Sequence, residues 1–358
     1  YENLIGQVWM VAAILIAGIL GIWKALVQRR YTETAGALAI SVLFVLIALF
    51  FVYQPERTVG EASRMTNTLS LAFLSGANRG SLDDPEQAKA YLAATAQWLR
   101  ELGYLDIAYM YLKDEPNDAE EYEIVRGQGA LIHEADPEIA RMCTEQTVTS
   151  NPEWGDLYGA VDIWCPLWGL WDEPTANQRL ELGERLWSYT ALCQGPEGTP
   201  WWQIDMDPLH FRAPFWTSWT YDITGFLYWS SVYWAYETME GAWERPAFRD
   251  NYWGEGMLLY PGTPAGIAGP VTSIRLKLAR EALEDYEYMA MAAALGGEGR
   301  LITRMGRERM EMVREPDSEA QVDALVADVA SSFRDWSHNA ADYERARERL
   351  AQMIVRGR

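Results

Sequence analysis

The stretch "LDIAYMYLKDEPND", Leu105 to Asp118, runs from apolar and aromatic residues straight into two adjacent carboxylic acids and a proline. A near-continuous apolar run of this length is typical of a strand that is buried on both faces in a parallel sheet. Pro116 stops the strand, because proline cannot donate a hydrogen bond to the next strand. The stretch therefore predicts that Asp114 and Glu115 stand at the carboxyl end of a buried strand.

Helices and short apolar runs alternate on both sides of this stretch. Four amphipathic segments predict helices at 90–104, 120–136, 177–187 and 210–222. Five apolar runs predict strands at 105–112, 138–146, 160–168, 188–194 and 223–234. Such alternation indicates βαβ units and an α/β fold with a parallel sheet. From Pro270 the pattern is helical, with helices expected at 273–295, 318–333 and 339–355.

The acidic pair has two interpretations. Functional side chains gather at the carboxyl ends of parallel strands, and the turn that follows a strand can direct both acids into one cleft. Alternatively, Asp114 and Glu115 form the N-cap and first turn of the next helix, where acids are also favoured.

Composition excludes several classes of function. The 51 acidic and 30 basic residues leave a net charge of −21, which disfavours nucleic acid as a partner. The three cysteines and three histidines lack ligand-like spacing, so we expect no disulfide framework, no metal site and no cofactor. The 17 tryptophans and 19 tyrosines crowd between Trp154 and Trp253, which fits either a ring-rich core or a sugar-binding cleft.

The first residues predict a membrane anchor. Leu4–Trp23 and Ala35–Tyr53 contain no charged residue, and each is long enough to span a bilayer. The connector carries Lys24, Arg29 and Arg30, which favours a cytoplasmic loop. We therefore expect a transmembrane hairpin over 1–58, with membrane contact through residues 4–53 and the rest of the chain outside a bacterial cytoplasm. A buried soluble hairpin is the alternative.

Further boundaries follow from changes in pattern. Residues 59–89 form a linker or amphipathic segment, residues 90–296 the α/β domain, and residues 297–358 a C-terminal helical extension. The chain begins with Tyr1 rather than methionine, which suggests a fragment of a longer protein. Residues 1–85 resemble membrane proteins of conjugal-transfer or type IV secretion systems.

Several ordered motifs carry a second resemblance, and the run from Gly225 to Tyr288 is the most specific part. The motifs are "YLKDEPND" (111–118), "ALCQGPEGTPWWQIDMD" (191–207), "FWTSWTYDITGFLYWSSVYW" (215–234), "GEGMLLYPG" (254–262), "GPVTSIRLKLAREALEDYEYM" (269–289) and "RERLAQMI" (347–354). Residues from about 90 to 354 resemble the catalytic domain of glycoside hydrolase family 123.

This resemblance implies an N-acetyl-β-galactosaminidase that acts on a glycan by a retaining, substrate-assisted mechanism. Asp114 would orient the 2-acetamido group of the sugar, and Glu115 would be the general acid and then the general base. The rings expected to bind the sugar are Trp164, Trp168, Tyr228, Trp229, Trp234 and Tyr260, and ordinary core positions are the alternative for each. Asp205 and Arg212 also match the family, and we predict that they form a polar pair at the site. The alternatives are that both are solvated surface residues or that they form an internal ion pair.

The chain also departs from the family. A complete (β/α)8 barrel needs eight strands, and we expect about five, because the first strand–helix units of the family barrel are missing. We therefore predict an incomplete barrel whose first and last strands are open edges. The alternative to a working glycosidase is therefore a truncated or chimeric remnant that serves as a membrane-associated structural or sugar-binding protein. A component of a secretion channel is a third possibility. The sugar epimer, the linkage and the oligomeric state are left open.

Overall fold

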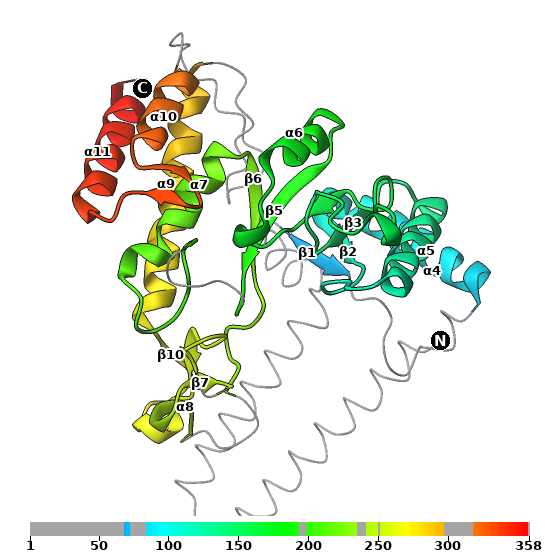
Figure 1. Ribbon diagram of the computed structural model, residues 1–358, viewed down its shortest axis with the longest axis horizontal. Helices are drawn as coiled ribbons and strands as arrows, with labels where there is room; N and C mark the ends of the chain where they lie inside the picture. The colour runs from blue at the N-terminus through cyan, green and yellow to red at the C-terminus, as the bar shows by residue number, and fades with distance from the viewer. Residues whose placement is uncertain are drawn as a thin grey trace, which may run out of the picture. The chain divides into compact units, whose positions relative to one another are not determined.

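A computed structural model describes residues 68–71, 84–192, 198–234, 241–249, 251–296 and 318–356. Six strands form one parallel sheet in the order of the sequence (Figure 1). They are β1 (Leu69–Leu71), β2 (Ala108–Tyr111), β3 (Ala140–Cys143), β4 (Ile163–Trp164), β5 (Arg185–Thr190) and β6 (Ile223–Tyr228). The expected incomplete α/β barrel is confirmed, with one strand more than the five predicted.

The additional strand is β1, which pairs in parallel with β2 and precedes residue 90. With three residues, β1 is too short for its sequence pattern alone to predict a strand. Among the described residues β1 pairs only with β2, and β6 only with β5. Within the part of the chain that the structure describes, both edges of the sheet are therefore open, as the sequence predicts for an incomplete barrel.

Helices connect the strands and begin at residues that suit a helix start. They are α4 (Pro85–Leu102), α5 (Ala119–Ala135), α6 (Glu173–Glu181) and α7 (Ala213–Thr220). The N-cap of α5 is Asp118, whose carboxylate accepts a hydrogen bond from the Glu121 amide at 2.8 Å. The alternative in which Asp114 and Glu115 cap this helix is therefore wrong, and both acids lie in the loop before it.

One predicted boundary is displaced. We expected a helix over 177–187, but α6 ends at Glu181 and Arg185 already belongs to β5. Gly183 has a φ of 81°, a left-handed conformation that breaks the helix and that glycine adopts without strain. The apolar residues after Gly183 are therefore free to form a strand.

Alternate residues of the strands pack on opposite faces of the sheet. Met110 of β2 and Leu186 of β5 pack in the core between the sheet and the helices. Their neighbours Tyr111 and Trp187 belong instead to the cluster on the inner face of the half-barrel, with Tyr189. Because side chains alternate along a strand, the inner face brings residues from β2 and β5 together at the carboxyl ends of the strands.

The C-terminal helices form a layer beside α7. Figure 1 shows α9 (Ile274–Ala293), α10 (Ser318–Ala327) and α11 (Ala340–Arg356) packed together with α7. The predicted helix over 318–333 stops at Ala327, because Ala330–Ser332 pairs as β11 with β12 (Asp335–Trp336). The Thr220 hydroxyl donates to the Ala330 carbonyl at 3.1 Å, so this short hairpin is anchored on α7.

Small elements complete the described chain. A short helix and four strands follow β6: α8 (Gly241–Glu244), β7 (Ala247–Phe248), β8 (Tyr252–Trp253), β9 (Leu259–Tyr260) and β10 (Val271–Thr272). Short 3-10 helices lie at Leu105–Ile107, Pro152–Trp154, Trp168–Leu170, Pro208–Phe211, Thr263–Ala265 and Ala294–Gly296.

The predicted transmembrane hairpin over 1–58 lies outside the described residues. Among the helices that the structure describes, none combines the length and the apolar character needed to cross a bilayer.

Candidate active site

A cavity of about 350 Å³ opens at the carboxyl ends of the strands. Side chains from the end of β2, from β5, from β6 and from β7 surround it. The lining residues are Tyr111, Asp114, Glu115, Tyr189, Ala191, Leu192, Leu227, Tyr228, Trp229 and Phe248. The structure therefore places both acids of the predicted pair at one cavity that is also lined by aromatic rings.

The loop that carries the acids is held in an unusual conformation. Glu115 has a φ of 43°, a left-handed backbone that costs a non-glycine residue about 1 kcal/mol or more. Two contacts stabilise it: the Glu115 amide donates to the Thr144 hydroxyl at 3.0 Å, and the Asn117 side-chain amide donates to the Glu115 carbonyl. The turn lets two adjacent side chains reach the same cavity.

Asp114 receives two hydroxyl donors. The Tyr111 hydroxyl donates to Oδ1 of Asp114 at 2.5 Å, and the Thr144 hydroxyl donates to the same oxygen at 3.1 Å. Burial raises the pKa of Tyr111, and the hydrogen bond to Asp114 raises it further, so the phenol remains a donor at neutral pH. Both hydrogen bonds hold the carboxylate in place through the same oxygen, Oδ1.

Glu115 has a separate partner, on strand β5. The Tyr189 hydroxyl, from β5, donates to Oε1 of Glu115. Burial chiefly raises the pKa of Tyr189, and the hydrogen bond to Glu115 adds to it. Each acid therefore has its own tyrosine, although 74 positions separate Glu115 from Tyr189. The two carboxyl groups are held in different environments, which two adjacent residues need if they are to perform different tasks.

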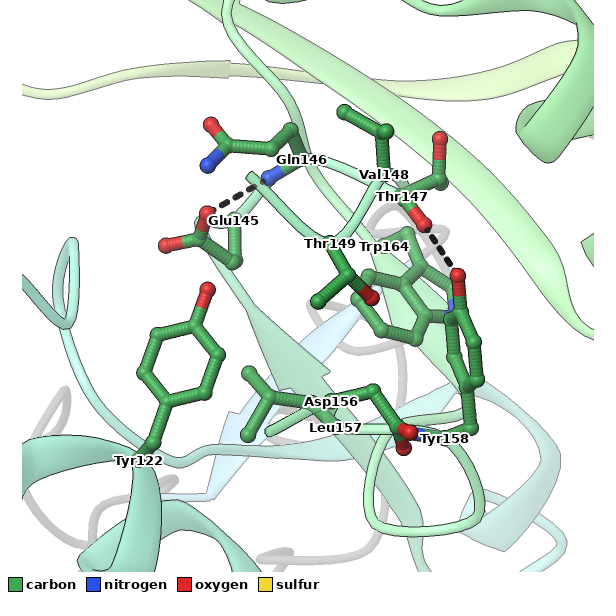
Figure 2. Close-up of a pocket in the computed structure, with 10 residues that line it drawn as sticks. All are labelled: Tyr122, Glu145, Gln146, Thr147, Val148, Thr149, Asp156, Leu157, Tyr158 and Trp164. Carbon is green, nitrogen blue, oxygen red and sulfur yellow. Dashed lines mark hydrogen bonds between the residues drawn. The ribbon is translucent and has the colours of Figure 1, made fainter. Parts of the chain in front are cut away.

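A third acid, Glu145, lines a second and much smaller space. It follows β3 and Thr144, and only 7% of the residue is exposed. Figure 2 shows the Tyr122 hydroxyl facing the Glu145 carboxylate beside a space of about 10 Å³, room for one water molecule. Burial raises the pKa of Glu145 to about 7, and the charge of Glu115 contributes in the same direction. Glu145 is thus protonated more readily than an exposed glutamate.

The replacement Glu145→Gln is expected to reduce the dependence of stability on pH. The pKa of Glu145 is about 7 in the folded chain and 4.5 ordinarily, so the folded state binds more protons between these values. The stabilisation is complete below pH 4.5 and is lost as the pH rises through 7. Glutamine does not titrate, so the variant lacks this loss of stability. The unfolding free energy of the variant minus that of wild type should therefore be about 1 to 3 kcal/mol larger at pH 8 than at pH 4.5.

Urea unfolding of the full chain at pH 4.5 and pH 8 measures this difference. The exposed Glu120→Gln, on the first turn of α5, is the control and should show no such trend. A difference between Glu145→Gln and wild type that stays constant with pH would contradict the prediction.

The remaining predicted site residues divide into two groups. Tyr228 and Trp229 line the cavity, where their contact with a sugar stays a prediction. Trp164 and Trp168 do not line it: both are about 1% exposed and pack in the core between sheet and helices. Trp234 and Tyr260 pack in a separate small cluster beside Met257.

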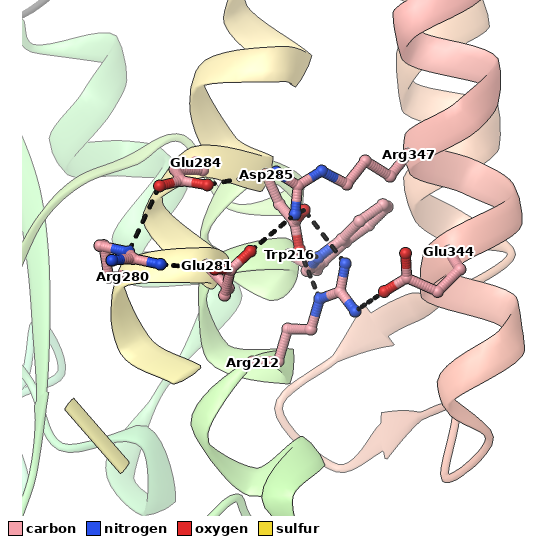
Figure 3. A network of polar contacts seen from close by, with 8 residues as sticks. All are labelled: Arg212, Trp216, Arg280, Glu281, Glu284, Asp285, Glu344 and Arg347. Atoms are coloured by element: carbon pink, nitrogen blue, oxygen red, sulfur yellow. Dashed lines mark hydrogen bonds and ion pairs between the residues drawn. The ribbon is translucent and has the colours of Figure 1, made fainter. Parts of the chain in front are cut away.

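The predicted pair of Asp205 and Arg212 does not form. Asp205 is exposed on a loop, whereas Arg212 is buried in the C-terminal helical layer. Figure 3 shows the guanidinium of Arg212 between Asp285 of α9 and Glu344 of α11. Arg212 therefore forms ion pairs with Asp285 and Glu344 and not with Asp205.

Sequence reasoning missed four residues that shape the site: Tyr111, Thr144, Tyr189 and Phe248. The runs that contain Tyr111 and Tyr189 predict strands, but nothing in these runs distinguishes the inner face of the sheet from the outer face. Thr144 and Glu145 were placed inside a strand that in fact ends at Cys143. The polar residues Thr144 and Glu145 directly follow the apolar end of this run, and that change of pattern indicates the end of the strand. Within the described ranges, no group of three acidic, histidine or cysteine side chains could hold a metal ion.

Comparison with known families gives a match. The family model described as "Glycoside hydrolase 123, catalytic domain" matches residues 61–292, about two thirds of the chain. The match starts before residue 90, where we expected the resemblance to begin, and it includes β1. It ends before residue 354. No curated protein matches the chain, and no comparison supports a resemblance of residues 1–85 to conjugal-transfer proteins.

Proposed function

Since the chain belongs to the glycoside hydrolase 123 family, we propose that it removes terminal β-linked N-acetylgalactosamine, or a related N-acetylhexosamine, from glycans. The reaction is retaining and uses the substrate's own acetamido group as the nucleophile. The observation that carries this proposal is the pair Asp114 and Glu115 at one cavity, each held by its own tyrosine.

In the first step the acetamido oxygen attacks C1 of the sugar while the bond from C1 to the leaving oxygen breaks. The proton of the Glu115 carboxyl group passes to that leaving oxygen. Asp114, as a carboxylate, accepts a hydrogen bond from the acetamido N–H and stabilises the positive charge that develops on the oxazolinium ring. The Tyr111 and Thr144 hydroxyls hold Asp114 in the orientation that this contact requires.

In the second step a water molecule attacks C1 from the face that the leaving group has vacated. Glu115, now a carboxylate, takes a proton from the water, and the bond from C1 to the acetamido oxygen breaks. The acetamido group is restored and the configuration at C1 is retained. Substrate assistance is one of the recognised exceptions to the scheme with a carboxylate nucleophile.

Two features of the cavity support a sugar as the ligand. Its volume of about 350 Å³ falls in the range of small-molecule sites. The rings of Tyr228, Trp229 and Phe248 offer flat apolar faces beside the acids, and such faces pack against the C–H face of a sugar.

Hydrolysis by the full chain in detergent tests the proposal. An aryl N-acetyl-β-galactosaminide and its gluco epimer should be compared, and proton NMR should detect the β-anomer as the first product. No release above buffer, together with binding of N-acetylgalactosamine, would favour the alternative of a sugar-binding remnant. Release of the α-anomer first would contradict the retaining mechanism.

We also propose that residues 4–53 anchor the chain in a membrane with the hydrolase domain on the outer face. The support is the pair of uncharged runs and the basic connector between them. Protease added to intact cells that express the full chain is expected to degrade the domain after residue 58. Complete protection of that domain until the cells are lysed would contradict this orientation.

A further inference from the structure

A buried carboxylate, Glu255, lies behind the aromatic side of the cavity. It stands in the loop between β8 and β9, none of the residue is exposed, and it does not line the cavity. Both of its oxygens receive donors: Trp229 donates its indole N–H to Oε1 at 2.7 Å, and the Gln203 amide donates to Oε2. A carboxylate with both oxygens engaged and no access to the cavity is not placed to exchange a proton with a substrate.

Trp229 is the link between Glu255 and the cavity. Its ring lines the cavity and lies against Phe248, which lines it too, with ring centroids 5.3 Å apart. The indole N–H is its one polar atom, so the bond to Glu255 sets the rotation of the ring within this packing.

Gly256 strengthens the same arrangement from the backbone. A Cβ at this position would lie 2.6 Å from Cζ2 of Trp229, and the φ of 70° favours glycine. The Gly256 amide also donates to the Tyr228 hydroxyl at 2.8 Å. Two consecutive residues, Glu255 and Gly256, therefore hold both of the neighbouring rings that line the cavity.

The charge of Glu255 is balanced nearby. Arg275 is 5% exposed and donates to the Gly254 carbonyl at 2.7 Å, to the Met257 carbonyl and to the Tyr260 hydroxyl. These bonds fix the loop on both sides of Glu255. Burial raises the pKa of Glu255 to about 7, while the donors Trp229, Tyr228 and Gln203 and the charge of Arg275 act in the opposite direction.

We propose that Glu255 is a positioning residue that holds the indole of Trp229 as the stacking wall of the sugar site. The inference rests on the proposed function for the identity of the ligand, and on the contacts alone for the position of the ring. Glu255 acts on binding through Trp229 and takes no part in proton transfer. Its loss should therefore weaken sugar binding and leave the chemical step nearly unchanged.

The replacement Glu255→Gln tests this role with little change of volume. A glutamine presents one acceptor and one N–H₂ group, so it cannot accept from Trp229 and Gln203 together. Loss of a hydrogen bond to a charged group corresponds to about a tenfold change in an equilibrium. We expect the KM for the aryl N-acetyl-β-galactosaminide, and the Kd for free N-acetylgalactosamine, to rise about tenfold, with kcat changed less than about threefold.

Glu184→Gln is the matched control. Glu184 also accepts an indole N–H, from Trp164 at 2.6 Å, but it lies at the amino end of β5, away from the cavity. It should lower stability without changing KM. An equal rise of KM in Glu184→Gln and Glu255→Gln would overturn the proposal, because a general loss of packing would then explain both.

The replacement Trp229→Phe completes a double-mutant cycle. Phenylalanine keeps a ring and removes the N–H that Glu255 binds. Adding Glu255→Gln to Trp229→Phe should therefore cause little further loss of affinity. Full additivity of the two losses would show that Glu255 does not act through Trp229 and would overturn the proposal.

An observation independent of activity separates this inference from the proposed function. In a chain with ¹⁵N-labelled tryptophan, the indole resonance that Trp229→Phe removes is expected to shift in Glu255→Gln and to stay in place in Glu184→Gln. An unshifted resonance in Glu255→Gln overturns the positioning role even if hydrolysis is confirmed. A shifted resonance in a chain that hydrolyses nothing and still binds N-acetylgalactosamine supports the positioning role, while the catalytic proposal fails.

Discussion

The replacement Glu115→Gln is expected to lower kcat/KM by about 10²- to 10⁴-fold for a substrate whose leaving group needs a proton, such as an alkyl N-acetyl-β-galactosaminide. Glutamine keeps the shape of the side chain and can still accept from the Tyr189 hydroxyl, but it has no proton to transfer. Formation of the oxazolinium then depends on the leaving group alone. A nitrophenolate leaves without protonation, so the first step with a nitrophenyl substrate should be much less affected.

Comparison with Asp114→Asn separates the two acids. Asp114 stabilises the acetamido group and not the leaving group, so its loss should slow alkyl and nitrophenyl substrates by similar factors. Steady-state rates with a series of leaving groups provide the measurement, and Glu120→Gln is the surface control. If Glu115→Gln slows all leaving groups equally in the first step, Glu115 is not the general acid.

The replacement Asp285→Asn is expected to cause the largest loss of stability, about 3 to 5 kcal/mol. Asp285 is fully buried and accepts hydrogen bonds from Nε of Arg212 at 2.6 Å and from the Trp216 indole at 2.9 Å, and it forms an ion pair with Arg347 across 3.3 Å (Figure 3). Asparagine removes the charge and leaves two guanidinium groups around a neutral amide. Among the described carboxylates, Arg212 then keeps its ion pair with Glu344, whose side chain is 61% exposed.

Thermal unfolding of the full chain, followed by tryptophan fluorescence, measures this loss as a decrease of Tm by about 10 °C. Glu281→Gln is the control within the same network: its side chain is 40% exposed, so the loss should be below about 1 kcal/mol. The double replacement of Asp285 by leucine and Arg212 by methionine should recover part of the stability, because it removes both buried charges. Equal stability of Asp285→Asn and Glu281→Gln would contradict the prediction.

Local patterns were sufficient for the α/β class and for the two acids. The apolar run before Asp114 is a strand, Pro116 follows it, and the acids lie at its carboxyl end. The long helices α4, α5, α9 and α11 occupy the predicted segments within a few residues, because their apolar spacing and their end signals are contained in the segments themselves.

The rings show where local patterns fail. A strand buried on both faces is apolar throughout, so its sequence does not distinguish side chains that face the cavity from those beneath the helices. For this reason Trp164 and Trp168 were assigned to the sugar site although they pack in the core. Tyr189, whose run reads the same way, faces the cavity.

Residues 105–118 alone are enough to predict that a buried strand brings two neighbouring acids to one edge of a parallel sheet. That information is local, because alternation, proline and helix caps act over a few residues. Which groups complete the site depends on the packing of the whole domain: Thr144 follows β3, Tyr189 lies on β5, and Glu255 holds Trp229. These contacts join residues far apart in the chain, and they exist only after the packing of the whole domain has brought the strand ends and loops together.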